Sequence, residues 1–331
     1  MEEFKVIEFQ KTRDFSRKLN ATFEFLRQNF KSLGKSILYI SGPPVLVGSL
    51  LLGSFMGEFL NLSQSLQRGA SEFESFSNYF LTASFWIQML LMFVFFLVSF
   101  VITIATINSY IVIYSEKKSN KIEVQEVWDR VRNTFWKYLG SSFLFFISFI
   151  IAYIILLIPI FILASISGFL VFFGVLFVIL GLIFLIFSSS LTYFIQLHEK
   201  KNFFDAIIRS FKLVNNGKWW STFGLIMILY MIMITISYIF MIPYYIITLT
   251  STLHTVSTGN PLEVSSTTAI ITTVSFTLYY MVQMLLSTLP NVGIAFQYFN
   301  LVELKEARGL MSQIETIGQP SVDPNRPEET F

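Results

Sequence analysis

The chain has 331 residues, of which 54% are apolar, 17% are aromatic and only 13% are charged. Soluble domains carry roughly 25% charged residues, so the composition excludes a soluble enzyme, a disordered chain and a nucleic-acid-binding module. The lack of cysteine excludes disulfides and thiolate metal sites, and two histidines are too few for a multi-histidine metal centre. We therefore predict neither a metal nor a cofactor.

Five long stretches contain no Asp, Glu, Lys or Arg: 36–57, 75–115, 138–197, 219–262 and 264–302. A membrane-spanning helix needs about 20 apolar residues. The third stretch has 60 residues and must fold back, because one helix of that length would measure about 90 Å. Turn-forming residues from Ser165 to Gly168 mark the break. We predict an all-α fold with six transmembrane helices, near 36–57, 82–112, 141–164, 168–190, 221–249 and 268–299.

Basic residues fall on one side of these spans. Residues 1–35, 115–140, 198–220 and 300–331 hold 22 of the 23 Lys and Arg residues, and the loops between them on the other side hold only Arg68. Cytoplasmic loops carry the excess of basic residues, so we expect both termini in the cytoplasm. Residues 1–318 form a single membrane domain, and the acidic, proline-containing tail over 319–331 predicts disorder.

Three basic amphipathic segments precede the first, third and fifth spans, over about 15–33, 124–135 and 203–214. Their apolar residues recur at spacings of three and four, which predicts three interfacial helices with one apolar face. These helices lie on the membrane surface or pack on neighbouring helices, and both interpretations can hold together. The candidate membrane-interface anchors are Trp128, Trp136, Lys137, Arg209, Lys218, Trp219 and Trp220.

The order of surface helix, span, outer loop and span occurs three times, over about 15–118, 121–201 and 202–305. Because each unit holds two spans, all three copies share one orientation, which predicts a threefold parallel internal repeat.

No ionisable residue falls inside a predicted span, so the usual sign of ion or proton coupling is missing. Amides and prolines do occur there. They either bond and kink packed helices or line a transport path. The candidate intramembrane polar and kink positions are Gln88, Asn108, Pro159, Pro243, Gln283, Pro290 and Asn291.

The repeated pattern, and above all Ala206 to Val214 (AIIRSFKLV), resembles the membrane domain that precedes some bacterial glycerophosphodiester phosphodiesterases and its stand-alone relatives. The segment Phe299 to Gly309 (FNLVELKEARG) is similar to stand-alone, uncharacterised members from Bacteroidota-type bacteria. The resemblance covers most of the chain. It implies a multi-pass protein of the bacterial inner membrane. It gives no reason to carry over enzymatic activity, since the catalytic barrel and its metal-binding carboxylates are absent from the sequence.

No catalytic motif stands in the sequence. Our leading hypothesis is therefore a non-enzymatic scaffold or subunit of a membrane complex, with membrane lipids and partner proteins bound at its cytoplasmic face. The alternative is a transporter or flippase for an apolar or lipid-like solute, which would need a polar-lined cavity near Pro290. A membrane-embedded enzyme with surface His or carboxylate groups is a third hypothesis.

Overall fold

The computed structural model describes residues 6–65, 78–259, 266–307 and Met311. The predicted tail over 319–331 lies outside these residues. Over the described part of the chain the elements are helices, with no strand. Six helical segments are long and apolar enough to cross a membrane: 42–60, 83–117, 124–166, 168–198, 219–258 and 266–306. The prediction of an all-α, six-span protein is confirmed, and the chain is an integral, multi-pass membrane protein.

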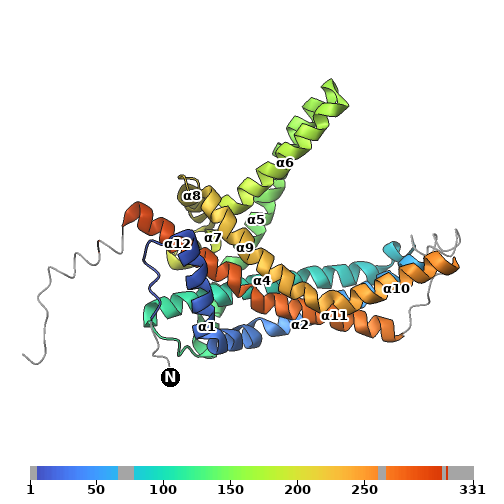
Figure 1. Ribbon diagram of the computed structural model, residues 1–331, viewed down its shortest axis with the longest axis horizontal. Coiled ribbons are helices and arrows are strands. Elements are labelled where there is room, and N and C mark those ends of the chain that lie inside the picture. Colours follow the sequence, from blue (N-terminus) through green and yellow to red (C-terminus); the bar gives the residue numbers. More distant parts are fainter. Residues whose placement is uncertain (1–5, 66–77, 260–265, 308–310, 312–331) are drawn as a thin grey trace, which may run out of the picture.

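The helices follow one another along the chain as labelled in Figure 1. Their bounds are α1 Phe15–Ile40, α2 Gly42–Ser65, α4 Ala83–Lys117, α5 Val124–Ile166, α6 Gly168–Ser188, α7 Thr192–His198, α8 Phe203–Val214, α9 Trp219–Tyr238, the 3-10 turn η2 Ile239–Met241, α10 Ile242–Thr258, α11 Ser266–Leu286 and α12 Thr288–Glu306. The predicted break between the third and fourth spans is correct. Ser167 separates α5 from α6, and its hydroxyl accepts a hydrogen bond from the Phe169 N–H at 3.3 Å, which caps α6.

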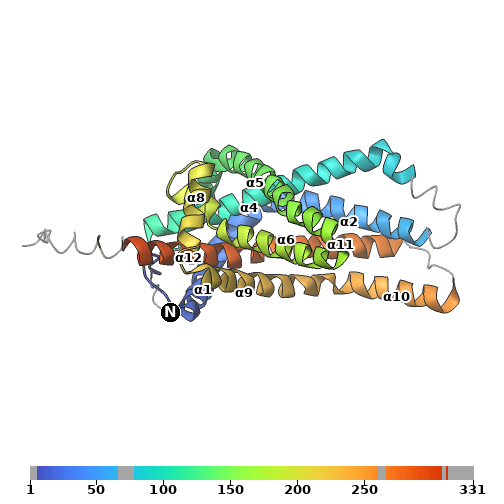
Figure 2. The same cartoon turned by 90° about the horizontal axis from the view of Figure 1, so that it is seen from above.

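The largest hydrophobic core lies at one end of the molecule, where α1, α7, α8, the end of α4 and most of α12 meet. The segment before α1 is part of this core: Phe9 stacks on Phe296 with ring centroids 4.9 Å apart. The Arg13 N–H also donates to Asn300 Oδ1 at 2.7 Å. The start of α1 and the end of α12 therefore lie together (Figure 2), as an even number of spans requires.

Away from this core the spans separate into two arms. Helices α5 and α6, here called the α5–α6 hairpin, diverge from the group that contains α2, α4, α9, α10 and α11 (Figure 1). The most apolar window of α5 has no buried residue. Close packing holds the hairpin together, because a Cβ atom at Gly174 would lie 3.0 Å from Ile160 Cγ1 and one at Gly181 would lie 2.9 Å from Leu156 Cδ2. Gly174 and Gly181 of α6 thus face α5.

Two of the three predicted surface helices are separate helices, and the remaining one is not. Ser41 separates α1 from α2, and residues 215–218 separate α8 from α9. In contrast, α5 runs unbroken for 43 residues, about 65 Å, so the second predicted surface helix is continuous with the third span. The expectation of a separate helix there is wrong: the segment contains no Pro, and Gly140 and Ser141 lie inside the helix without ending it. The threefold repeat stays a prediction.

Helix α1 does not bury the face that its apolar spacing suggests. Phe23 and Phe30 are exposed, while Lys18, Thr22 and Asn29 are buried. The polar face is inside because its side chains find partners: Tyr110, for example, donates from its hydroxyl to Asn29 Oδ1 at 3.0 Å. The buried face of α1 is therefore mixed, because Phe25, Leu33 and Ile37 are buried beside these polar residues. Packing on neighbouring helices describes this face, and Phe23 and Phe30 are left outward.

Candidate functional site

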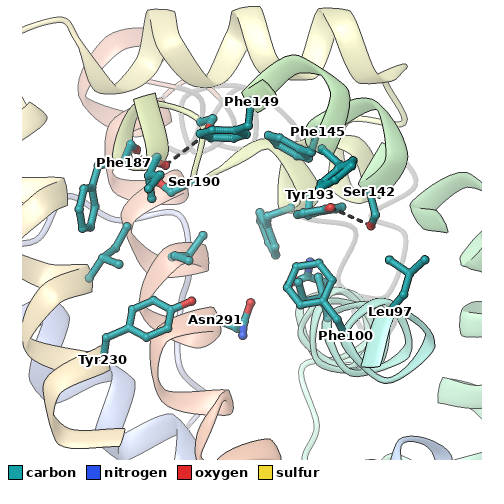
Figure 3. A pocket seen from close by; sticks show the side chains of 18 of the residues that line it. Leu97, Phe100, Ser142, Phe145, Phe149, Phe187, Ser190, Tyr193, Tyr230 and Asn291 are labelled. Atoms are coloured by element: carbon teal, nitrogen blue, oxygen red, sulfur yellow. Dashed lines mark hydrogen bonds between the residues drawn. The ribbon is translucent and has the colours of Figure 1, made fainter. Parts of the chain in front are cut away.

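A cavity of about 910 Å³ lies between the α5–α6 hairpin and the helices α4, α9 and α12 (Figure 3). Its walls come from segments far apart in sequence, and most of them are aromatic or aliphatic. Several wall residues, including Phe100, Phe146 and Ile147, are at least half exposed. Because these residues belong to membrane-spanning helices, the cavity opens toward the bilayer rather than into a closed core.

The cavity contains several polar groups but no charged residue among the described residues that line it. On the hairpin side, Ser142 Oγ and the Tyr193 hydroxyl share a hydrogen bond of 2.9 Å. Behind them, the Tyr138 hydroxyl donates to the Tyr193 carbonyl at 2.9 Å, and Asn108 Nδ2 donates to the Tyr138 hydroxyl at 3.3 Å. These bonds join α4, α5 and α7 along one wall of the cavity.

The opposite wall presents two polar groups with free bonding capacity. Asn291 Nδ2 donates to the Ser287 carbonyl at 2.7 Å, which satisfies a backbone oxygen at the break between α11 and α12 and turns Oδ1 toward the cavity (Figure 3). The Tyr230 side chain is 40% exposed and its hydroxyl points into the same space (Figure 3). Within the described chain neither Asn291 Oδ1 nor the Tyr230 hydroxyl has a hydrogen-bond partner.

The cavity lies in the half of the membrane next to the basic loops. Ser142 follows Lys137 by five residues and Asn108 precedes Glu116 by eight, which places these groups about 8–12 Å from the charged helix ends. Phe149 and Phe93 lie deeper along the same two helices. The polar groups on the hairpin side are thus nearest the headgroups. On the opposite wall Tyr230 and Asn291 lie deeper, twelve residues from Lys218 and fourteen from Lys305, at about the depth of Phe149.

Serines stabilise the break between α6 and α7 beside the cavity. The Ser210 hydroxyl of α8 donates to the Ser188 carbonyl at 2.6 Å and accepts from the Leu191 N–H at 3.3 Å. Ending α6 at Ser188 frees backbone groups that need partners at this depth. The short helix α8 supplies them, so α8 supports the part of the wall that carries Ser189 and Ser190.

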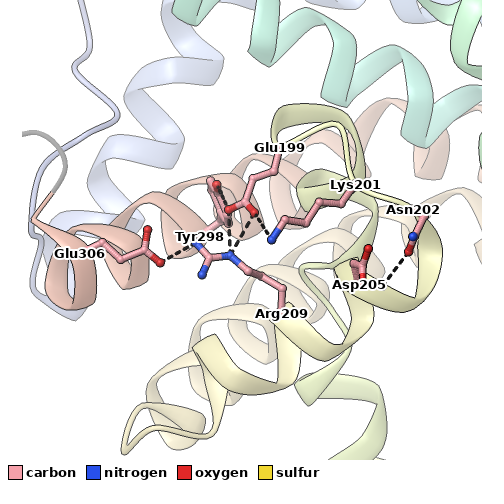
Figure 4. A network of polar contacts seen from close by, with 7 residues as sticks. All are labelled: Glu199, Lys201, Asn202, Asp205, Arg209, Tyr298 and Glu306. Atoms are coloured by element: carbon pink, nitrogen blue, oxygen red, sulfur yellow. Dashed lines mark hydrogen bonds and ion pairs between the residues drawn. The ribbon is translucent and has the colours of Figure 1, made fainter.

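An ionic network fixes α8 to α7 and α12 (Figure 4). The Glu199 side chain is 8% exposed, and both its oxygens accept from Arg209 Nε at 3.0 Å. Arg209 Nη2 also pairs with Glu306 at 2.6 Å, Lys201 Nζ lies 3.1 Å from Glu199, and the Tyr298 hydroxyl donates to Glu199 at 2.7 Å. Burial raises the pKa of the Glu199 carboxyl, but the bonds from Tyr298, Lys201 and Arg209 hold that pKa below its ordinary value.

We predict that Arg209→Met loosens α8 and lowers stability by about 2 kcal/mol, since a charged hydrogen-bond network loses its central donor and leaves a buried carboxylate. Limited proteolysis between α8 and α9 and the thermal unfolding midpoint in detergent measure this. Lys212→Met, an exposed residue on the same helix, is the matched control. Arg209→Lys should recover only part of the loss, because an ammonium cannot form the planar fork. Equal unfolding midpoints for Arg209→Met and Lys212→Met would show that Arg209 does not hold α8 in place.

The predicted interface anchors occupy two kinds of place. Trp128, Trp136 and Trp220 are exposed, as are Lys137 and Lys218, so all five are free to meet headgroups. Trp219 instead packs in the protein, stacked on Phe223 at 5.2 Å and on Phe184 at 6.0 Å. Arg209 is bound in the ionic network. The basic and aromatic pattern alone could not distinguish these surroundings.

The predicted polar and kink positions divide similarly. Asn108 and Asn291 line the cavity, whereas Gln88 and Gln283 are half-buried outside it. Pro243 lies at the start of α10, just after the turn η2 that joins α9 to α10. Pro290 is buried just after the break at Ser287. Pro159 stands inside α5 without ending it.

Sequence reasoning did not identify Lys18, which is 2% exposed. Its ammonium donates to Gln297 Oε1 at 2.6 Å and to Ser221 Oγ at 2.8 Å, and Gln297 Nε2 donates to Thr222 at 2.7 Å. The spacing of Lys18, Thr22 and Asn29 on one helical face is the signal that could have found it. Tyr230 and Ser142 were also missed, since single tyrosines and serines in apolar helices carry no distinctive pattern.

Comparison with known proteins finds no matching family, no similar curated protein and no similar solved structure. The resemblance to the membrane domain of glycerophosphodiester phosphodiesterases therefore stays a prediction. Across the described residues, no three His, Asp or Glu side chains come together to hold a metal ion. The site is thus defined by its own geometry: an uncharged cavity open to the bilayer in an integral membrane protein.

Proposed function

We propose that this protein binds a lipid-like, largely apolar solute in the cavity beside the α5–α6 hairpin and acts as a transporter or flippase for it. The cavity of about 910 Å³ is the observation that carries the proposal. Ligand sites in proteins measure roughly 300–1,000 Å³ and combine apolar walls with a few polar groups. In a bilayer, acyl or prenyl chains are the molecules that reach such an opening.

The surroundings of the cavity support movement of a solute as well as binding. Two of its walls belong to interrupted spans, since α9 ends at η2 and α12 begins after Ser287. Interrupted helices that line a cavity recur in transporters. The alternative hypothesis from sequence expected a polar lining near Pro290; Asn291 and Asn108 fit it, while most of the wall is apolar and suits a lipid-like solute. We place the basic loops on the cytoplasmic side, and hence the opening of the cavity in the cytoplasmic leaflet.

Filling the cavity tests this function. Ile147→Trp adds an indole to the wall and should reduce co-purified lipid, measured by native mass spectrometry in mild detergent, to less than a quarter of the wild-type amount. Ile154→Trp is the matched control, because Ile154 is an exposed residue of the same helix outside the cavity, and it should retain lipid. If the wild type retains none, or both variants retain it equally, the proposal fails.

The second candidate is the scaffold or complex subunit. The outward face of the α5–α6 hairpin favours it, because Ile155, Phe161 and Phe172 are more than half exposed and suit either lipid or partner helices. A groove of about 700 Å³ between α1 and the start of α5 also presents Lys31, Lys35 and Tyr39 to a partner or headgroup. Cross-linking in native membranes decides: a defined partner supports this role, and a chain that cross-links to nothing excludes it.

A further inference from the structure

We infer that the cavity selects an uncharged amphiphile whose head carries a hydroxyl group, and that it rejects lipids with a phosphate head. This inference rests on the proposed function and names the class of solute. The chemistry is shared by diacylglycerols and long-chain prenyl alcohols. Both place one hydroxyl at the end of one or two apolar chains.

The charge of the wall is the first argument. None of the described residues that line the cavity is charged, and Arg209, close in sequence to Ser210, is held by Glu199 and Glu306. A phosphate that entered would lose its water and gain no cation. Burying an unpaired charge costs far more than burying a neutral hydroxyl that finds hydrogen bonds. The wall therefore disfavours the common phospholipid heads.

The free hydrogen-bonding groups are the second argument. Asn291 Nδ2 is used by the Ser287 carbonyl, so the atom that faces the cavity is Oδ1, which can only accept. The Tyr230 hydroxyl, which points into the cavity from α9 (Figure 3), can donate. An alcohol can give its proton to Asn291 and accept from Tyr230 at once, whereas an ionised phosphate has no proton to give. The pair thus matches a hydroxyl, whereas an anionic oxygen can accept from Tyr230 but is repelled by Asn291 Oδ1.

The apolar wall agrees with a long chain on this head. Tyr230 and Asn291 lie on α9 and α12, and the aromatic rings of Phe100, Phe145 and Phe149 line the space between them and the hairpin (Figure 3). The acyl or prenyl chain of a solute whose hydroxyl lies between Tyr230 and Asn291 can leave through the opening between the two arms without passing a charged group.

Binding of three probes to the purified full chain in detergent tests the selection, by native mass spectrometry titration. Dioleoylglycerol and dioleoyl phosphatidic acid share their chains and differ by the phosphate, and a long-chain prenyl alcohol carries the hydroxyl alone. We expect dioleoylglycerol to bind at least tenfold more tightly than the phosphatidic acid. Tyr230→Phe should lower the affinity for dioleoylglycerol about threefold to tenfold and leave the affinity for phosphatidic acid unchanged.

Tyr238→Phe is the control, because Tyr238 is a half-exposed tyrosine two turns further along α9 and outside the cavity; it should change neither affinity. Phe143→Lys adds a cation at the wall close to the charged helix end and should raise phosphatidic acid binding. The selection is overturned if phosphatidic acid binds the wild type as tightly as dioleoylglycerol does. In that case the proposed function would still be supported if the wild type retains lipid and Ile147→Trp does not. Tight prenyl alcohol binding shows that the hydroxyl suffices, and a protein that binds none of the probes overturns the selection.

Discussion

Gly53→Ala should destabilise the protein by about 1–3 kcal/mol, the usual cost of an added methyl group in a filled interior. A Cβ atom at Gly53 would lie 2.7 Å from Thr273 Cα and 2.9 Å from the Thr273 carbonyl oxygen. Both atoms belong to the backbone of α11, so no side-chain rotation can make room, and α2 must move away from α11. The thermal unfolding midpoint in detergent and the SDS concentration at half-unfolding both measure the loss.

Gly57→Ala is the matched control one helical turn away on the same face. Its Cβ would meet Ala269 Cβ at 3.6 Å, an ordinary contact, and alanine favours a helix over glycine. This variant should be neutral or slightly more stable than the wild type. If Gly53→Ala and Gly57→Ala unfold at the same midpoint, α2 does not approach α11 this closely at Gly53.

Gln297→Leu should cost about 3 kcal/mol at pH 7, because it leaves the buried Lys18 ammonium with Ser221 as its hydrogen-bond acceptor, and an unmatched charged donor is expensive. The double variant Lys18→Met, Gln297→Leu removes the charge together with its acceptor. It should be close to wild type or more stable, since apolar residues of similar volume often replace buried polar pairs without loss. Thermal unfolding of the single and double variants measures the difference.

The cost should also depend on pH. Burial lowers the pKa of Lys18 to about 8, with the charge of Lys218 as a smaller cause, while an unfolded lysine keeps a pKa near 10.4. Between these values the unfolded chain binds more protons than the folded chain, so wild-type stability rises with pH from about 8 to about 10. The deficit of Gln297→Leu should shrink as the pH rises to about 8, because deprotonation of folded Lys18 removes the buried charge, and should stay constant above that pH. A deficit equal at pH 7 and pH 9.5 would show that Lys18 keeps its proton.

The spans could be predicted from sequence because a bilayer imposes one simple requirement, a long uncharged helix. The turn at Ser167 could be predicted for a related reason, since a 60-residue apolar helix would be far longer than a bilayer is thick. The surface segments were harder. The sequence 124–135 carries the same periodicity as 203–214, yet it continues into a span, because nothing between Trp136 and Ser141 stops the helix.

The cavity could not be predicted, because it exists only where α4, α5, α6, α9 and α12 meet without filling the space between them. Asn108 and Asn291 were recognised as unusual in apolar helices, but their polarity could not show that both reach one cavity while Gln88 and Gln283 stay outside. Lys18 was assigned to a surface helix by its charge. Its burial depends on Gln297 and Ser221, more than two hundred residues away in sequence, and no local pattern records such a partner.

The unbroken α5 also has a mechanical consequence. Tyr138 is fixed against Tyr193 by ring stacking at 5.4 Å with an interplanar angle of 6°, and this point divides α5 into a loop-side part of 14 residues and a membrane part of 28. The helix is therefore a lever with arms of about 21 and 42 Å. Val127 and Val131 hold the short arm in the hydrophobic core, so any tilt of α5 about Tyr138 displaces the hairpin tip twice as far as the end near Val124.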